Sequence, residues 1–307
     1  MAALGDTLRT WRRRFKASLP YVRRREHRVL QAKYAELIEA IDGHAPAADA
    51  TALHFAKPIA AEACGEICIF VTFAEEPRLK DHVSRHVRHL LAAGIDVIVV
   101  VNTDVAAGAF EIDPSLLARV RGFAIRRNTG YDFGAWAHLL SICGSETRHW
   151  TRLFLVNDSI VGPLRAADFE TLIARIRSST ADVIGLTEAL LPIRHLQSYF
   201  LVFGSRALQS GAVQRVFGRV RNWPAKGQVV DVYESRLTAV FEAQGLRCEA
   251  LFPSLSGDPL SSDDTSLRWA ELVAAGFPYL KTRVLASHAG DPRIAAWLAD
   301  RPSLPDR

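Results

Sequence analysis

Apolar runs of strand length recur along the chain and alternate with segments that carry apolar residues at helical spacing. Buried strands of parallel sheets read as continuous apolar runs. Strands that alternate with helices form sheets covered by helices on both faces. We therefore predict an α/β fold with a mostly parallel sheet and flanking helices. The predicted strands are 67–73, 97–101, 123–125, 153–156, 183–186 and 199–203, with 247–252 as a further candidate.

Helical patterns fill the spaces between these strands. Val83, Val87 and Leu90 predict a helix that Gly94 ends. The segment 169–176 predicts another helix. The side chains His82, His86 and His89 share the first of these helices. Their spacing could bind zinc, but no further ligand is indicated, so we expect a solvated helix face.

The second half of the chain is less regular. A turn is predicted at 222–227, and a helix opens at Glu234 and ends at Gly245. A further helix is capped at 263–265, and the sequence 276–278 ends it. These elements surround the last predicted strand and complete the body of the protein.

The first 43 residues differ from the rest in charge. Up to residue 28 the net charge is +7, whereas the whole chain carries +5 and the remainder −2. Leu4, Leu8 and Trp11 recur at helical spacing among arginines, which predicts a basic helical N-terminal arm over 1–43. Such an arm suits an anionic membrane surface. A solvated arm packed on the body, or an arm that recruits a protein partner, are the alternatives.

The remaining sequence divides into a linker at 44–66, a body at 67–287 and a C-terminal tail at 288–307. The near-neutral body lacks a basic face with interleaved aromatic residues, which argues against nucleic-acid binding. The sequence shows neither an apolar stretch of membrane-spanning length nor an N-terminal secretory pattern. We expect a cytoplasmic protein, peripheral on the inner face of the cell membrane if the arm binds lipid. Its four scattered cysteines are expected to be reduced.

Polar residues cluster where three predicted strands end. In parallel sheets, ligands bind beyond the carboxyl ends of the strands. A nucleoside diphosphate there needs a metal ion, backbone amides or basic groups to balance its charge. Asp158 is the expected ligand of Mg²⁺ or Mn²⁺, and Asp132 lies between glycines that permit close approach of a ligand. Helix caps or turns are the alternative interpretation of these clusters. The candidate donor-binding residues are Phe73, Glu75, Asn128, Gly130, Asp132, Asn157, Asp158 and Ser159.

Several motifs over 67–287 together resemble the rhamnan synthesis protein F family. They are the segments 128–136, 157–163, 195–200, 264–269 and 276–281. The resemblance implies a glycosyltransferase of the GT-A type, with Asn157-Asp158-Ser159 where GT-A enzymes carry Asp-x-Asp. It also implies roles near the donor sugar or acceptor for His195, Gln197, Ser198 and Tyr199. A strand-entry turn is the alternative role for these four residues.

A second resemblance concerns the catalytic base. Glu234, Leu237 and Gly245 stand at the intervals at which many inverting GT-A enzymes carry their base, a leucine and a glycine. The resemblance implies that Glu234 is the general base, with Asp231 and Glu188 as reserve candidates. The alternative is a carboxylate that stabilises a helix N-terminus.

The resemblance therefore implies transfer of a deoxyhexose, L-rhamnose from dTDP-rhamnose, to a growing cell-surface polysaccharide or a lipid-linked glycan. Inversion at the anomeric carbon is implied by the resemblance alone. The alternative function is a non-catalytic nucleotide- or glycan-binding subunit of a polysaccharide assembly complex.

Overall fold

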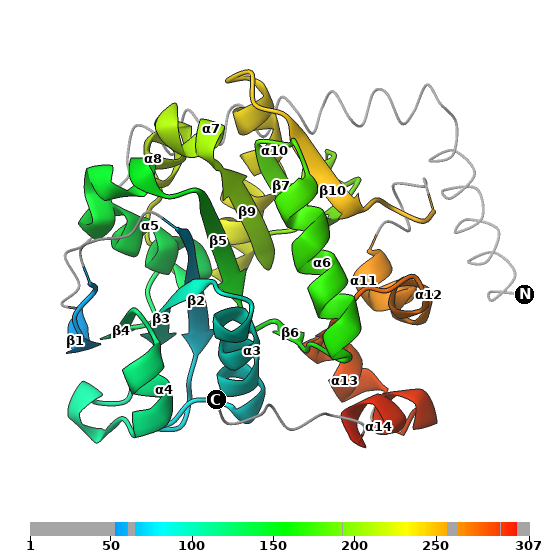
Figure 1. The fold of residues 1–307 in the computed structure, drawn as a ribbon, viewed down its shortest axis with the longest axis horizontal. Coiled ribbons are helices and arrows are strands. Elements are labelled where there is room, and N and C mark those ends of the chain that lie inside the picture. Colours follow the sequence, from blue (N-terminus) through cyan, green and yellow to red (C-terminus); the bar gives the residue numbers. More distant parts are fainter. Residues whose placement is uncertain (1–52, 61–64, 192, 257–262, 289, 300–307) are drawn as a thin grey trace, which may run out of the picture. The chain divides into compact units, whose positions relative to one another are not determined.

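The computed structural model describes residues 53–60, 65–191, 193–256, 263–288 and 290–299 (Figure 1). A nine-stranded central sheet has the strand order β1-β4-β3-β2-β5-β9-β7-β10, with β8 paired to β7. The predicted N-terminal arm at 1–43 lies outside the described residues. The strands are β1 (His54–Lys57), β2 (Glu66–Phe73), β3 (Asp96–Asn102), β4 (Gly122–Arg126), β5 (Arg152–Asn157), β7 (Val183–Ala189), β8 (His195–Leu196), β9 (Phe200–Gly204) and β10 (Cys248–Phe252).

The predicted mostly parallel sheet is confirmed. Strands β4, β3, β2 and β5 are parallel neighbours, and β7 and β10 are parallel to each other. Strand β9 runs antiparallel to both β5 and β7 and lies between them. The connection from β7 to β9 passes through β8, which pairs antiparallel with β7. Because this connection is short and carries no crossover helix, β9 returns in the opposite direction.

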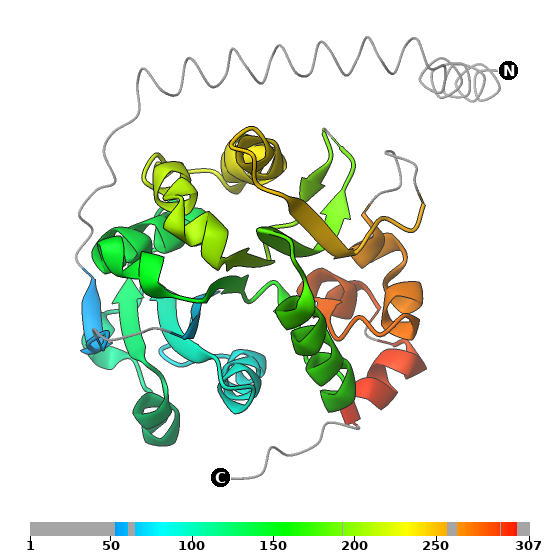
Figure 2. The ribbon, with the colours of Figure 1, turned by 45° about the horizontal axis from the view of Figure 1, so that its top comes forward.

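Helices cover both faces of the sheet (Figure 2). On one face, α3, α4 and α6 pack on side chains such as Phe70, Val99 and Phe154. On the other face, α5, α7, α8 and α10 pack on Ile69, Leu155 and their neighbours. The alternation of side chains along each strand thus fills two cores, as in sheets buried on both faces. The helices are α3 (Asp81–Ala92), α4 (Pro114–Arg119), α5 (Tyr131–Cys143), α6 (Ala166–Ser178), α7 (Ser205–Gln209), α8 (Ala212–Phe217) and α10 (Ser235–Glu242).

The predicted solvated histidine face of α3 is wrong. His86 is 1% exposed and lies among Phe70, Phe200 and Tyr279. Its Nε2 lies 3.0 Å from the hydroxyl of Tyr279, and burial lowers its pKa to about 3. His89 is also buried and packs edge-on against Phe169. A neutral imidazole can serve as a core side chain, and the helical spacing alone does not distinguish that role from a polar face.

The second half contains a longer helical stretch than predicted. Helix α9 (Lys226–Val229) continues through a π-helical turn (Val230–Glu234) into α10. Glu234 therefore lies inside a continuous helix, and the predicted helix start at this residue is wrong. Such π-helical turns are rare and are frequently found at functional sites. The turn predicted at 222–227 is wrong at its end, because the chain is helical from Lys226 onward.

A small C-terminal layer packs beside the end of the sheet. Strand β6 (Ile160–Val161) pairs antiparallel with β11 (Leu280–Lys281). Helices α11 (Asp264–Leu267), α12 (Trp269–Ala274), α13 (Thr282–Ser287) and α14 (Pro292–Ala299) follow or flank this pair. Ile294 of α14 packs in a cluster with Trp269 and Val284. Helix α14 lies inside the predicted tail, and β1 lies inside the predicted linker, since both are too short to give a clear pattern.

No helix in the described part of the chain combines the length and apolar character needed to cross a bilayer. The thiols of Cys68, Cys143 and Cys248 are free, and burial raises the pKa of Cys68. Cys64 lies outside the described residues.

Candidate functional site

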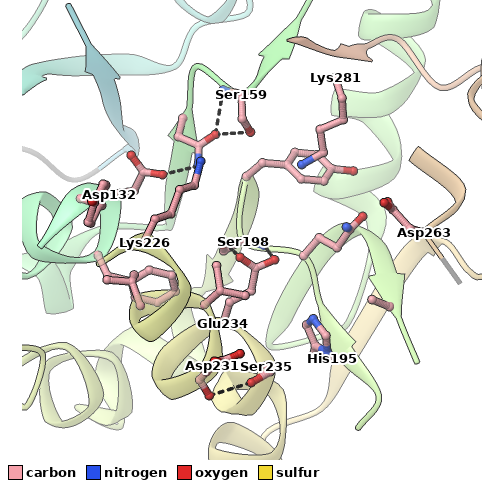
Figure 3. Close-up of a pocket in the computed structure, with 18 of the residues that line it drawn as sticks. Asp132, Ser159, His195, Ser198, Lys226, Asp231, Glu234, Ser235, Asp263 and Lys281 are labelled. Atoms are coloured by element: carbon pink, nitrogen blue, oxygen red, sulfur yellow. Dashed lines mark hydrogen bonds between the residues drawn. The ribbon is translucent and has the colours of Figure 1, made fainter. Parts of the chain in front are cut away.

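A cavity of about 550 Å³ opens at the carboxyl edge of the sheet (Figure 3). Its walls come from the start of α5, the end of β5, the β7–β9 connection, the helical stretch 226–235 and β11. Cavities of this size hold small ligands such as cofactors. The position agrees with the rule that ligands bind beyond the carboxyl ends of parallel strands.

Nine of the predicted site residues line this cavity, although they come from four separate segments of the chain. The lining includes Asp132, Asn157, Ser159, His195, Gln197, Ser198, Tyr199, Asp231 and Glu234. The other predicted donor-binding residues lie outside the lining. They are Phe73, Glu75, Asn128, Gly130 and Asp158.

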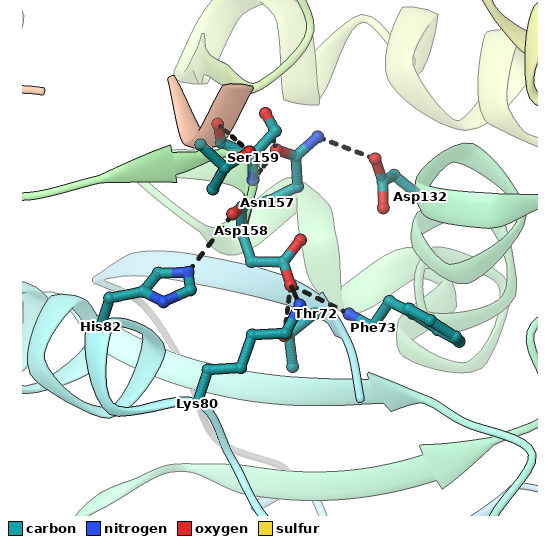
Figure 4. A network of polar contacts seen from close by, with 9 residues as sticks. Thr72, Phe73, Lys80, His82, Asp132, Asn157, Asp158 and Ser159 are labelled. Carbon is teal, nitrogen blue, oxygen red and sulfur yellow. Dashed lines mark hydrogen bonds and ion pairs between the residues drawn. The ribbon is translucent and has the colours of Figure 1, made fainter. Parts of the chain in front are cut away.

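The carboxylate of Asp158 is bound by the protein itself (Figure 4). Its Oδ2 accepts hydrogen bonds from Thr72 Oγ1 at 2.7 Å, from the amide of Phe73 at 3.2 Å and from Lys80 Nζ at 2.9 Å. We call these four residues the Asp158 cluster. They join the end of β2 to the loop after β5 and to the entry of α3, and a cation at Oδ2 would compete with the Lys80 ammonium.

Gly130 faces another part of the protein rather than the cavity. Its φ is +68°, and a Cβ there would lie 2.4 Å from Asn222 Oδ1 and 2.9 Å from Asn222 Cα. A Cβ at Gly134 would meet the same Asn222 oxygen at 2.6 Å. Gly130 and Gly134 thus permit close packing of the start of α5 against the segment that carries Asn222. The sequence had predicted close approach of a ligand at these glycines.

The segment that follows Gly130 is held in a strained conformation. Tyr131 has a φ of 53°, which is uncommon for a residue with a side chain. The buried Arg126 donates to Asn102 Oδ1 and to the carbonyl of Thr129, both at 2.9 Å. Asn102 in turn donates to the carbonyl of Tyr131 at 3.2 Å. This network fixes the first turn of α5 and with it the position of Asp132.

Asp132 is the carboxyl group of the cavity whose protonation is most perturbed. Burial, followed by the nearby charge of Asp158, raises its pKa to about 7. Its Oδ2 accepts a hydrogen bond of 2.8 Å from Asn157 Nδ2. Asn157 Oδ1 accepts from the amide and the hydroxyl of Ser159. Asn157 therefore links the end of β5 to the start of α5 across the edge of the cavity.

Glu234 projects from the π-helical turn toward the β8–β9 connection (Figure 3). Its Oε2 accepts from Ser198 Oγ at 2.9 Å, and its Oε1 accepts from the amide of Ser198 at 3.4 Å. These contacts fix the carboxylate at the cavity wall while lone pairs remain for another donor. Asp231, one turn earlier, is exposed, and its backbone carbonyl accepts from Ser235 Oγ.

The four predicted sugar- or acceptor-binding residues all line the cavity. The Tyr199 hydroxyl is buried against Thr187 Oγ1, which donates to Gln197 Oε1 at 2.6 Å. Burial raises the pKa of Tyr199, so its hydroxyl is a neutral hydrogen-bond donor. His195 Nδ1 donates to the carbonyl of Ile193 at 2.8 Å, which leaves Nε2 as an acceptor.

Glu188, the second reserve base, is engaged elsewhere. Its carboxylate pairs with Arg194 at 2.7 Å and accepts from the amide of Ser254 at 3.2 Å. It does not line the cavity. The geometry therefore favours Glu234 over Glu188 as the group that can reach a ligand.

Three basic residues line the cavity that were not predicted from the sequence: Lys226, Lys281 and Arg283. Arg283 pairs with Asp263 on the same wall. Lys281 Nζ lies 3.7 Å from the centre of the Tyr199 ring, and burial lowers its pKa to about 8. Lys226 falls in the turn predicted at 222–227, and Lys281 falls in the motif 276–281 that carries the family resemblance. Isolated lysines give no spacing signal, and only the fold shows that they share one cavity.

The residues do not form an evident cation site. Among the described residues, no group of three or more His, Cys, Asp and Glu side chains is arranged to hold a metal ion. Asp158 Oδ2 already accepts three hydrogen bonds, and Asp132 has a raised pKa. The prediction of Mg²⁺ or Mn²⁺ at Asp158 thus finds no prepared set of donors.

Comparison with known proteins adds the family context. An uncharacterized protein, y4gN, from Sinorhizobium fredii is 29% identical over 202 residues, which cover 64% of this chain and 50% of that protein. Virulence protein VirA from Vibrio anguillarum is 26% identical over 207 residues, 56% of this chain and 65% of that protein. The match to this chain thus spans between half and about two thirds of each relative.

The family model described as rhamnan synthesis protein F matches residues 97–301. The match begins at β3 and reaches past α14, so it includes every segment that lines the cavity. It covers more than half of the chain. The chain therefore belongs to the rhamnan synthesis protein F family.

Proposed function

We propose that this protein is a GT-A-type glycosyltransferase that moves a deoxyhexose, L-rhamnose from dTDP-rhamnose, to a growing cell-surface polysaccharide or lipid-linked glycan. Membership of the rhamnan synthesis protein F family supports the polysaccharide product. The cavity at the carboxyl edge of the sheet supports a nucleotide-sugar donor, since that edge is the usual place for such ligands.

The observation that carries the proposal is the carboxylate of Glu234 in the cavity wall. It is oriented by both the amide and the hydroxyl of Ser198 and lies on the same cavity as Asn157 and Ser159 at the end of β5. A general base must lie within hydrogen-bonding reach of the proton that it removes. Glu234 is fixed by Ser198 and is open to the cavity, so an acceptor hydroxyl bound in the cavity can lie within hydrogen-bonding reach of its carboxylate.

The chemistry follows from this placement. The acceptor hydroxyl oxygen attacks the anomeric carbon of the donor while Glu234 takes the hydroxyl proton. The bond from the anomeric carbon to the diphosphate oxygen breaks, and its electron pair leaves with the diphosphate. Attack from the face opposite the leaving group inverts the configuration. We assign His195 Nε2 and the side-chain amide nitrogen of Gln197 to the sugar and acceptor hydroxyls, whereas Tyr199, whose hydroxyl is hydrogen-bonded to Thr187, presents its ring to Lys281.

A divalent ion would neutralise the leaving diphosphate if one were bound. The donor set around Asp158 does not favour such a site, and we route no step through a metal. The N-terminal arm, outside the described residues, is proposed to bring the protein to an anionic membrane surface on the cytoplasmic side, where a lipid-linked acceptor would be reached.

The test is a transfer assay with dTDP-rhamnose and a rhamnan or lipid-linked acceptor, in which dTDP release and glycan extension are both followed. The wild-type chain should extend the acceptor. Glu234→Gln should lower the turnover by about 10²–10⁴-fold, as expected for loss of a general base, and should still bind dTDP. Near-full turnover by Glu234→Gln would mean that another group is the base.

The second candidate function is a non-catalytic nucleotide- or glycan-binding subunit of a polysaccharide assembly complex. The engaged carboxylate of Asp158 is the observation that favours it, because a metal-dependent transferase would keep this group available. Under this alternative the protein would bind dTDP but extend none of the acceptors in the same assay.

A further inference from the structure

Two lysines face the same cavity from opposite walls. Lys226 begins α9, and Lys281 ends β11 (Figure 3). Both line the cavity, and among the described residues neither ammonium group has a carboxylate at ion-pair distance. Charged side chains that face a cavity without a partner are suited to a ligand of opposite charge. We call these two residues the lysine pair.

Contacts of the neighbouring residues fix the positions of the two segments that carry the lysines. Tyr131, in its strained conformation at the start of α5, donates its hydroxyl hydrogen to the carbonyl of Pro224 at 3.2 Å, two residues before Lys226. On the other wall, Lys281 is paired with Ile160 in the β6–β11 ladder, and the amide of Thr282 donates to Ser159 at 2.9 Å. Lys226 is thus held beside the start of α5, and Lys281 is held beside the segment that follows β5.

The acidic groups of the cavity influence the lysine pair without forming an ion pair with it. Burial lowers the pKa of Lys281 and the charges of Glu234 and Asp263 oppose that shift, while Lys226 acts to lower the pKa of Asp132. Arg283 and Asp263 neutralise each other. Asp132 has a pKa of about 7, so much of it is uncharged near neutral pH. Glu234 accepts hydrogen bonds from Ser198, and Asp231 is an exposed carboxylate on the same helical stretch (Figure 3). The arrangement suits a ligand that carries two negative charges close together.

From this arrangement we propose that the lysine pair binds the diphosphate of the nucleotide-sugar donor directly and does not require a divalent cation. The inference rests on the proposed function for the identity of the donor. Lysine is a point charge with three donors and commonly binds phosphate groups. Both lysines are placed to stabilise the negative charge that develops on the leaving diphosphate.

The Asp158 cluster, which lies on the opposite side of the candidate site, supports the same inference. Lys80 is the lysine nearest to the position expected for a metal, yet it is paired with Asp158 at 2.9 Å. The positive charge at the ends of β2 and β5 is therefore already balanced inside the protein. The two cavity lysines, which form no ion pair with a described residue, lie instead on the walls formed by the second half of the chain.

The test is calorimetric titration of the full chain with thymidine, dTMP, dTDP and inorganic pyrophosphate, each in Mg²⁺ and in EDTA. The variants are Lys226→Met and Lys281→Met, with Lys281→Arg to keep the charge. Arg119→Met removes one positive charge from an exposed position on α4 and is the matched control. Thermal unfolding of each variant checks that it is folded.

We expect dTDP to bind with the same affinity in Mg²⁺ and in EDTA. Each methionine variant should weaken dTDP and pyrophosphate binding about tenfold, because it removes a hydrogen bond to a charged group. Thymidine binding should not change, Lys281→Arg should retain most of the dTDP affinity, and Arg119→Met should behave as wild type.

Three results would overturn the inference. Binding of dTDP that disappears in EDTA and is unchanged in the lysine variants would assign the diphosphate to a metal ion. Variants that weaken thymidine as much as dTDP would show that the lysines only shape the cavity. If nucleotides fail to bind but pyrophosphate binds through the lysines, the lysine pair stands and the proposed dTDP donor is wrong. If pyrophosphate also fails to bind, the inference is wrong.

Discussion

The two sides of the candidate site treat charge differently. In the Asp158 cluster, one carboxylate oxygen, Oδ2, accepts hydrogen bonds from a hydroxyl, an amide and an ammonium group of the protein. On the opposite side, Glu234 and the lysine pair present charged atoms to a cavity of about 550 Å³. The first side has the geometry of a structural joint between β2, β5 and α3. The second side has groups that can act on a ligand.

The difference shows why a polar cluster at a strand end is not by itself a site. A strand end brings polar residues to the correct edge of the sheet, but their partners decide whether they are available. Asp158 comes from the position that the resemblance implied for a metal ligand, and its partners lie 78 to 86 residues away in sequence. Such partners cannot be predicted from spacing.

The largest expected effect contrasts the two carboxylates directly. Glu234→Gln should reduce turnover by about 10²–10⁴-fold with little change in stability. Asp158→Asn should lower the free energy of unfolding by about 1–3 kcal/mol, because Lys80 and Thr72 lose a charged acceptor, and should affect turnover far less. Turnover assays and chemical denaturation of the two variants measure both quantities. A larger loss of turnover in Asp158→Asn than in Glu234→Gln would reverse the assignment.

A second prediction concerns the packing that holds the start of α5. Gly130→Ala should lower the free energy of unfolding by about 2–4 kcal/mol, since φ is +68° and the new Cβ would meet the backbone of Asn222. Gly245→Ala is the matched control. It has a φ of +76° but no atom within 4 Å of a Cβ, so only the backbone cost of about 1 kcal/mol should appear. Equal losses would show that Asn222 is not the obstacle.

A third prediction follows from the raised pKa of Asp132. A carboxyl group with a pKa of about 7 in the folded state and about 4 in the unfolded state stabilises the fold at acidic pH and loses that contribution as the pH rises from 4 to 7. Asp132→Asn should therefore raise the free energy of unfolding at pH 8 by about 1–3 kcal/mol and change it little at pH 4.5.

Thermal unfolding at a series of pH values measures this effect. Asp104 is exposed, so Asp104→Asn is the control and should not raise the free energy of unfolding at pH 8. A gain for Asp132→Asn of the same size at pH 4.5 and pH 8 would contradict the assignment, because it would not depend on ionisation of the carboxyl group.

The smallest effect concerns the charge of Lys281. Its pKa of about 8 means that the ammonium form is lost as the pH rises from 7 to 9.5, so dTDP affinity should fall by about tenfold over that range. Lys281→Met should bind more weakly at pH 7 and show a flatter profile. The charged or titratable groups that face Lys281 are Glu234, Asp263, Arg283, Lys226 and Tyr199. A wild-type profile that is flat from pH 7 to 9.5 would contradict this role.

The sequence was sufficient to predict most strands of the sheet and the edge at which the cavity opens. Each parallel strand is a continuous apolar run, so β2, β3 and β5 were identified within one residue of their ends. The carboxyl-edge rule then brought Asp132, Asn157 and Ser159 together. The resemblance to the family added Glu234 and the four residues at 195–199 that line the same cavity.

The remaining features depend on contacts between distant segments. The antiparallel course of β9 follows from a short connection and leaves no mark in its own apolar run. The obstruction at Gly130 comes from Asn222, and the position of Lys281 comes from pairing with Ile160. Neither contact has a local pattern. The helical start at Lys226 was missed because Pro224 and Gly227 resemble a turn.

The most direct test of the difference between the two sides is a crystal structure of the protein with dTDP bound. We predict that the diphosphate lies between Lys226 and Lys281, with phosphate oxygens within about 3.2 Å of both ammonium groups, and that the Lys80–Asp158 pair stays intact. A diphosphate bound beside Asp158 through a cation, with Lys80 displaced and the lysine pair empty, would contradict the account.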